Sequence, residues 1–185
     1  LTITHDIKAP AASISGFIDL MKEYVSDPKG TSCLSNIKNS ASHLSQLVAS
    51  LLDYHQLENG LMQLNPVNFS PEQLVKLSVE GLRLQAEKKG LAISCEFLNA
   101  DKDNIWGKIF RADDFRIRQV LDNLVSNAIK YTDQGSVHIM ASIRQARNEY
   151  NIIIDEHTYE LTLQVKDTGK GMTSEEKQKV FQAFT

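Results

Sequence analysis

The chain has 185 residues, of which 42% are hydrophobic and 23% charged, so it is long enough for one ordinary globular domain or two small ones. Its formal net charge of -3 argues against a nucleic-acid-binding surface, which needs a basic field. Apolar runs stay shorter than the roughly 18 to 20 residues of a membrane span, and the first residues do not have the form of a secretory signal. We therefore expect a cytoplasmic piece of a longer protein, without membrane contact of its own, and its two cysteines, Cys33 and Cys95, as free thiols.

Two segments near the start have apolar residues at every third or fourth position, which is the pattern of packed helices. The first stripe is Ile7, Ala11, Ile14, Ile18, Met21 and Val25, and the second is Leu34, Ile37, Ala41, Leu44, Val48 and Leu51. A break at residues 26–30 makes them a hairpin. Because one hairpin cannot bury both stripes, we expect two copies to pair as an antiparallel four-helix bundle, which makes the protein a homodimer.

A change of composition marks the end of this hairpin. Asn59-Gly60 and Pro66 interrupt the helical pattern, and we place a domain boundary near residue 65. An all-α hairpin over residues 1–64 is therefore followed by a domain over residues 65–185 that mixes helices and strands. Antiparallel neighbours are expected there, so its class is α+β.

The second domain is expected to contain three helices and at least three strands. Alternating apolar residues predict strands over residues 91–97, 137–143 and 159–165, with a further strand at 106–110. Capping residues and apolar periodicity predict helices over residues 71–89, 114–132 and 174–184, capped by Ser70, Asp113 and Thr173. Segment 144–158 holds either an extra hairpin or a long strand extension, and the sequence leaves both open.

The first candidate site is the motif His5-Asp6-Ile7-Lys8-Ala9-Pro10. With Thr4 and Ile7 at core positions of the helix, His5 lies on the exposed side. A neutral imidazole is a nucleophile near pH 7, and the carboxylate of Asp6 can orient it or accept its proton. The alternative is an incidental surface histidine, and the motif alone does not decide between them.

The second candidate site is a helix face that carries Asn123, Asn127, Lys130 and Tyr131. Two amide oxygens one turn apart suit a hard cation such as Mg2+, and a lysine one turn further can meet phosphate oxygens. Because Asn123 cannot act as a general base, the site suits holding ATP without spending it on water. The alternative is a plain polar surface, with Val120, Leu121, Leu124 and Ile129 packing inward.

The third candidate site is the turn Asp167-Thr168-Gly169-Lys170-Gly171, which follows an expected strand. A carboxylate can accept a hydrogen bond from the amino group of adenine, and glycines let the backbone pass close to a ring or adopt positive φ. The turn is not a P-loop, because the lysine and hydroxyl after the last glycine are missing. Taken alone, it is also compatible with a simple polar turn.

In this order the three motifs resemble the H, N and first glycine boxes of a sensor histidine kinase of a two-component system. The resemblance covers nearly the whole chain. It implies that residues 1–64 are the dimerisation and histidine phosphotransfer hairpin, and that residues 65–185 are a catalytic ATP-binding domain, a Bergerat-type sandwich of helices on a mixed sheet. It further implies ATP and Mg2+ as ligands, autophosphorylation of a histidine, and transfer of the phosphoryl group to an aspartate of a response-regulator receiver domain.

The resemblance also implies a role for each motif residue. The implied phosphoacceptor and its acid–base partner are His5 and Asp6. The residues implied to bind the nucleotide and its metal are Asn123 and Asn127 for Mg2+, Lys130 for phosphate, Tyr131 for the nucleotide, Asp167 for adenine, and Gly169 and Gly171 for the pocket wall. Asn123 stands where the related type II topoisomerase and mismatch-repair ATPases place a water-activating glutamate.

Three departures from the family pattern lead to further expectations. Lys8 replaces the usual arginine and loses its bidentate fork. Ala9 stands where many members carry threonine or asparagine, so we expect weak phosphatase activity. The chain stops at Thr185, before the second glycine box, most of the ATP lid and the closing strands, so we expect an incomplete domain with an uncovered sheet edge and poor nucleotide affinity.

A competing hypothesis follows from the last of these departures. It is a non-catalytic dimeric scaffold or phosphotransfer module, which accepts phosphate at His5 but binds ATP poorly. The resemblance also makes a membrane-anchored parent plausible.

Overall fold

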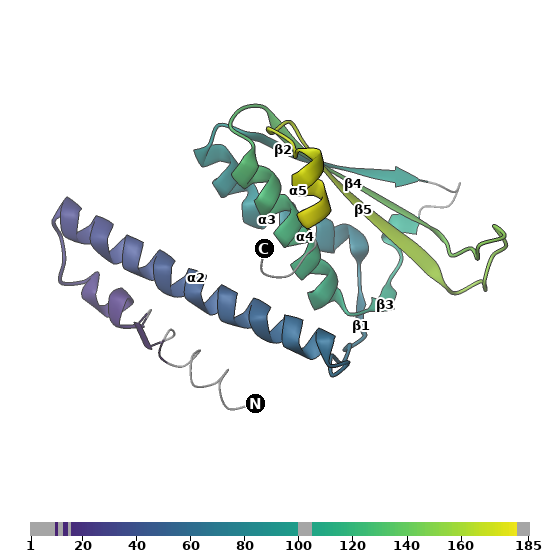
Figure 1. Ribbon diagram of the computed structural model, residues 1–185, viewed down its shortest axis with the longest axis horizontal. Coiled ribbons are helices and arrows are strands. Elements are labelled where there is room, and N and C mark those ends of the chain that lie inside the picture. The colour runs from purple at the N-terminus through teal and green to yellow at the C-terminus, as the bar shows by residue number, and fades with distance from the viewer. Residues whose placement is uncertain (1–9, 11–12, 15, 100–104, 181–185) are drawn as a thin grey trace. The chain divides into compact units, whose positions relative to one another are not determined.

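In the computed structural model the chain divides into two compact units, residues 1–64 and 65–185 (Figure 1). The structure describes residues 10, 13–14, 16–99 and 105–180. The expected phosphoacceptor motif, with His5, Asp6, Lys8 and Ala9, lies outside the described residues.

The first unit contains the long helix α2 (Pro28–Glu58), preceded by a helical segment over residues 16–21. Helix α2 begins at Asp27, whose Oδ1 accepts a hydrogen bond from the Gly30 N–H at 2.7 Å, with Pro28 in the first turn. The predicted break at residues 26–30 was therefore placed too late, because residues 28–30 already belong to the helix and residues 22–27 form the break. An ion pair of 2.7 Å between Lys38 and Asp19 joins the two helical segments.

The predicted apolar stripes are only partly buried within this unit. Ile18, Leu34 and Ala41 are buried. Other stripe members keep about half of their surface exposed, namely Ile14, Met21, Ile37, Leu44 and Leu51. One hairpin therefore buries only part of the apolar surface that its sequence pattern provides.

The second unit is built on a three-stranded mixed sheet of β2 (Ala92–Asn99), β4 (Ser136–Gln145) and β5 (Tyr159–Asp167), in the order β2-β4-β5. Strand β4 runs parallel to β2 and antiparallel to β5. Helices α3 (Pro71–Lys88) and α4 (Asp114–Tyr131) lie side by side against this sheet (Figure 1). A small antiparallel sheet of β1 (Val67–Phe69) and β3 (Phe110–Ala112) and the short helix α5 (Ser174–Lys179) complete the described fold, which confirms the expected helices on a mixed sheet.

The core of this unit lies between the sheet and the two helices. Strand β4 alternates along its length, with Val137, Ile139, Ala141 and Ile143 buried toward the helices and the intervening residues partly exposed. Helix α4 contributes Leu121, Val125, Ala128 and Ile129. Val120 and Leu124, which the polar-surface alternative packed inward, are instead 59% and 45% exposed.

Two local predictions differ from the structure. The strand expected at 106–110 is a 3-10 turn, Ile105–Gly107, followed by β3 from Phe110. The turn buries Trp106, whose ring stacks edge-on against Phe97 at 4.8 Å between centroids. Helix α5 ends at Lys179, short of the expected end near Phe184.

The open question at 144–158 resolves as an extended hairpin. Strands β4 and β5 pair from Gln145 opposite Tyr159, and an isolated bridge pairs Arg147 with Ile153 beyond them. Among the described helices, none is both long and apolar enough to cross a bilayer.

Candidate functional site

Helix α4 presents the predicted amide face to solvent because its opposite face is fixed in the core. Asn123, Asn127 and Lys130 are exposed, and Tyr131 is 48% exposed. Leu121, Val125 and Ile129 anchor the other side of the helix. With a rise of about 1.5 Å per residue, Asn123 lies roughly 12 Å along the axis from Tyr131, and Asn127 about half that.

The start of α4 is held by Asp113. Its Oδ1 accepts the Arg116 N–H at 3.0 Å, and its Oδ2 accepts the Asn65 N–H at 2.9 Å. The bond from Asn65, followed by that from Arg116, lowers the pKa of the Asp113 carboxyl below its usual value. One carboxylate therefore caps the site helix and also holds the first residue of the second unit.

The end of α4 is held by a residue that the sequence did not single out. The Lys89 ammonium donates to the carbonyl oxygens of Ile129 at 2.9 Å, Lys130 at 2.8 Å and Thr132 at 3.1 Å. The last carbonyls of a helix have no intrahelical partners, so these bonds satisfy groups that otherwise face water.

The glycine turn is tied to the sheet through Thr168. Its Oγ1 donates to the Gln134 carbonyl at 3.1 Å and accepts the Ser136 N–H at 3.0 Å, and its N–H donates to the Ser136 carbonyl at 3.2 Å. Just before it, Asp167 Oδ1 accepts the Gly169 N–H at 2.8 Å. These bonds fix the direction of the Asp167 side chain at the end of β5.

Gly169 is required by a close approach to the end of α4. A Cβ at this position would lie 2.5 Å from the Tyr131 carbonyl oxygen and 2.9 Å from Thr132 Oγ1. The motif predicts glycines here because they let the backbone lie close to a ligand ring. In the structure, the atoms that leave no space for a side chain at Gly169 belong to the protein itself. Gly171, in contrast, has a φ of +67° and open space around it.

The structure thus brings the end of α4 and the glycine turn together. The Lys170 N–H points to the Tyr131 carbonyl oxygen at 3.4 Å. The Tyr131 ring has the Lys130 ammonium 5.2 Å and the Lys170 ammonium 5.6 Å from its centroid. The sequence motif predicts only a turn at Lys170, because its place beside an aromatic ring depends on contacts across almost 40 residues.

One polar atom at this junction is buried without a hydrogen-bond partner among the described residues. Thr132 is fully buried, and its Oγ1 has no hydrogen-bond partner among the described residues. It lies on the same side of Gly169 as Asp167 Oδ1. A buried hydroxyl without a partner is costly, and a ligand or water reaches this oxygen only if the residues around it move.

The metal prediction rests on amide oxygens alone. Within the described chain, no group of three or more His, Cys, Asp or Glu side chains is arranged to hold a metal ion. Asn123 and Asn127 are exposed and offer oxygen ligands of the kind that Mg2+ accepts. Such a site needs phosphate oxygens of a bound nucleotide to complete it.

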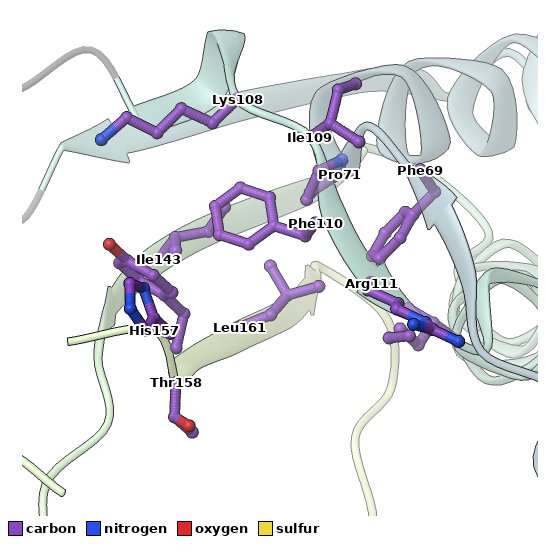
Figure 2. Close-up of a pocket in the computed structure, with 13 residues that line it drawn as sticks. Phe69, Pro71, Lys108, Ile109, Phe110, Arg111, Ile143, His157, Thr158 and Leu161 are labelled. Atoms are coloured by element: carbon purple, nitrogen blue, oxygen red, sulfur yellow. The ribbon is translucent and has the colours of Figure 1, made fainter. Parts of the chain in front are cut away.

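A cavity of about 470 Å³ lies elsewhere in the second unit (Figure 2). Phe69, Phe110 and Leu161 face into it, and Lys108 and His157 lie at its edge. None of the predicted site residues that the structure describes lines it. A more open hollow of about 380 Å³ touches Asn123, together with Phe115 and Arg118.

Comparison with known protein families gives matches to both units. Residues 2–60 match the His Kinase A (phospho-acceptor) domain, and residues 112–185 match the histidine kinase-, DNA gyrase B- and HSP90-like ATPase domain. The chain belongs to the sensor histidine kinases. The second match includes α4 and the glycine turn.

Curated relatives that match almost the whole chain carry the names of histidine kinases. Hybrid signal transduction histidine kinase K of Dictyostelium discoideum is 31% identical over 184 residues, which is 99% of this chain and 15% of that protein. The signal transduction histidine-protein kinase BarA of Escherichia coli K12 is 28% identical over 182 residues, 98% of this chain and 18% of that protein. The chain thus spans less than a fifth of the length of these histidine kinases.

Solved structures agree with the fold. Full-length ShkA in complex with AMPPNP superposes with a TM-score of 0.68 at 23% identity, over 95% of this chain and 34% of that one. The histidine kinase ThkA in complex with the response regulator TrrA gives a TM-score of 0.52 at 26% identity, over 99% of this chain and 48% of that one.

Proposed function

We propose that this histidine kinase chain carries the phosphoacceptor and catalytic parts of an ATP-dependent protein histidine autokinase. The observation that carries the proposal is the presence of both family matches in one chain, the phosphoacceptor match over residues 2–60 and the ATPase match over residues 112–185. Residues 1–64 then serve as the dimerisation and phosphotransfer hairpin, and residues 65–185 as the ATP-binding domain.

ATP is proposed to bind at the junction of α4 and the glycine turn. Asp167 accepts a hydrogen bond from the adenine amino group through its outer oxygen, since the inner one is bonded to the Gly169 N–H. Tyr131 contacts the nucleotide and Lys130 its phosphates. Gly169 and Gly171 shape the wall, Gly169 because only glycine fits against α4.

Asn127 and Asn123 are proposed to hold Mg2+ together with the nucleotide phosphates. When bound, the metal neutralises charge that develops on the transferring phosphoryl group. Asn123 cannot take a proton from water, so the bound nucleotide is kept for phosphotransfer.

The proposed reaction joins His5 to the γ-phosphorus of ATP. An imidazole nitrogen of His5 forms the N–P bond as the bond to the oxygen bridging the β- and γ-phosphorus breaks, and ADP leaves. Asp6 orients the ring and accepts the proton that the imidazole loses. The phosphoryl group then passes to an aspartate of a response-regulator receiver domain, a partner class supported by the complex of ThkA with TrrA.

The helical unit is proposed to act as a homodimer. Its apolar stripes leave Leu44 and Leu51 about half exposed within one copy, and pairing of two hairpins would cover them. Because Ala9 has no polar atom to orient water, we also propose weak phosphatase activity toward the regulator.

The test combines labelling with nucleotide binding. The chain is incubated with γ-labelled ATP and Mg2+, alone and as His5→Gln and Asp167→Ala variants, with binding of AMPPNP measured in parallel. Acid-labile label that both substitutions abolish, with AMPPNP binding lost only in Asp167→Ala, would support the autokinase. Because poor nucleotide affinity is expected of the 185-residue chain, the same measurements are made on a form extended past Thr185. A folded extended form that neither binds AMPPNP nor takes up label would contradict the autokinase and favour the scaffold.

A further inference from the structure

The contact of Lys89 with the end of α4 carries an inference beyond the motif residues. Its ammonium meets three carbonyl oxygens, those of Ile129, Lys130 and Thr132, at 2.8 to 3.1 Å. The first two belong to the last turn of the helix. A positive group at a helix C-terminus is also favoured by the helix dipole.

The local sequence fixes Lys89 in the place from which it can make these bonds. Helix α3 ends there in a Schellman turn, in which the Leu91 N–H donates to the Ala86 carbonyl at 3.0 Å and the Gly90 N–H to the Glu87 carbonyl at 2.9 Å. Gly90 takes the left-handed φ of +71° that this turn requires. Lys89 is therefore the C-cap residue of α3, and Gly90 and Leu91 connect it to β2, which begins at Ala92.

The helix end that Lys89 holds is the one that carries site residues. Lys130 and Tyr131 belong to the last turn of α4, and the Tyr131 carbonyl oxygen is the one that the Lys170 N–H of the glycine turn approaches at 3.4 Å. The glycine turn lies so close to this end that a Cβ at Gly169 would be 2.5 Å from the Tyr131 carbonyl oxygen. A displaced last turn would therefore shift Lys130 and Tyr131 relative to Asp167.

We propose that Lys89 is a positioning residue for the nucleotide site. Its ammonium holds the last turn of α4 so that Lys130 and Tyr131 keep their place opposite Asp167, without itself touching the nucleotide. The proposal rests on the proposed function, because it assigns the purpose of the contact to nucleotide binding.

The experiment compares Lys89→Met with a matched control, Lys88→Met, which removes the same charge from the neighbouring exposed residue of α3. Affinity for AMPPNP with Mg2+ and amide hydrogen exchange without nucleotide are measured at a temperature where thermal unfolding shows every variant folded. Lys89→Met is expected to weaken binding on the order of tenfold and to speed exchange in the last turn of α4 only. Lys88→Met is expected to leave both unchanged, and Lys89→Arg to restore part of the affinity.

The outcomes separate the two proposals. Lys89→Met binding as tightly as Lys88→Met would overturn the role of Lys89 alone. Loss of protection throughout α4 and β4, with no rescue by arginine, would show a purely structural contact and would also overturn it. Absence of AMPPNP binding by the unsubstituted chain, also when it is extended past Thr185, would instead contradict the proposed function.

Discussion

The two units bury the same kind of apolar residue by different means. In the second unit, α3, α4 and the sheet enclose a core in which Leu121, Ile129 and Ile139 have no exposed surface. In the first unit, Ile18, Leu34 and Ala41 are buried, while five other described stripe residues remain about half exposed. Apolar periodicity therefore predicts which face of an element is buried, but not whether the same copy of the chain supplies the cover.

Because of this difference, the two proposed activities require different things of the chain. A nucleotide site built on a closed core needs only its own unit. A phosphoacceptor hairpin with open stripes needs a second copy, so its stability depends on protein concentration. The predictions that follow test this contrast, from the largest expected effect to the smallest.

The largest effect is expected from Ile139→Ala in β4. The side chain is fully buried, and removing it leaves a cavity in the closed core, which costs about 2 to 5 kcal/mol of unfolding free energy. Urea unfolding followed by the fluorescence of the buried Trp106, the one tryptophan of the chain, measures this unit. A loss below about 1 kcal/mol would show that the core is not closed as described.

A charge among the half-exposed stripe residues of the first unit should instead weaken the association of two copies of the chain. Leu44→Glu places a carboxylate in the proposed dimer contact of each copy, and we expect the dimer dissociation constant to rise about a hundredfold, or about 3 kcal/mol. Sedimentation at several concentrations measures it. Ser42→Glu, at an exposed position two residues away, is the matched control. An unchanged dimer in both variants would place the contact elsewhere.

Gly169→Ala tests the close approach in the site. The new Cβ would crowd the Tyr131 carbonyl oxygen and Thr132 Oγ1, so the turn or the helix end must move. We expect AMPPNP affinity to fall about tenfold, which is about 1.4 kcal/mol. Gly81→Ala, in α3 with nothing closer than 4.0 Å, should leave affinity unchanged and stabilise the fold by about 0.5 to 1 kcal/mol.

The smallest expected effect is the pH dependence from Asp113. Hydrogen bonds from the Asn65 and Arg116 N–H groups lower its pKa from the ordinary value of 3.8. The carboxylate therefore stabilises the folded state above that value, and this contribution is lost as the pH falls through the lowered pKa. Melting curves of the unsubstituted chain and Asp113→Ala should differ at neutral pH and converge in acid. A constant difference at all pH values would contradict this assignment.

Much of the second unit could be read from local sequence signals. Ser70 and Asp113 accept the hydrogen bonds of helix caps, as their sequence context indicates. Trp106 instead lies in a buried turn, where its ring packs against Phe97. The local alternation of apolar and polar residues does not encode this contact.

The candidate site could be predicted only in part, because some of its contacts join residues that are far apart in the sequence. Asn127, Lys130 and Asp167 stand in motifs, so they could be named directly. Lys89 could not be named from the sequence, because even the nearest carbonyl that it binds, that of Ile129, is 40 residues away. Its partners are backbone atoms, so no pattern of side chains indicates the contact. The buried hydroxyl of Thr132 could likewise not be predicted, because its burial depends on tertiary packing.

The most direct test of the account is the position of the phosphoryl group after reaction with ATP and Mg2+. Peptide mapping under conditions that preserve N–P bonds should find the group on His5 alone, with none in Asp167→Ala. A phosphoryl group on another residue, or on His5 in the absence of Asp167, would contradict the pairing of a nucleotide site in the closed unit with an acceptor in the open one.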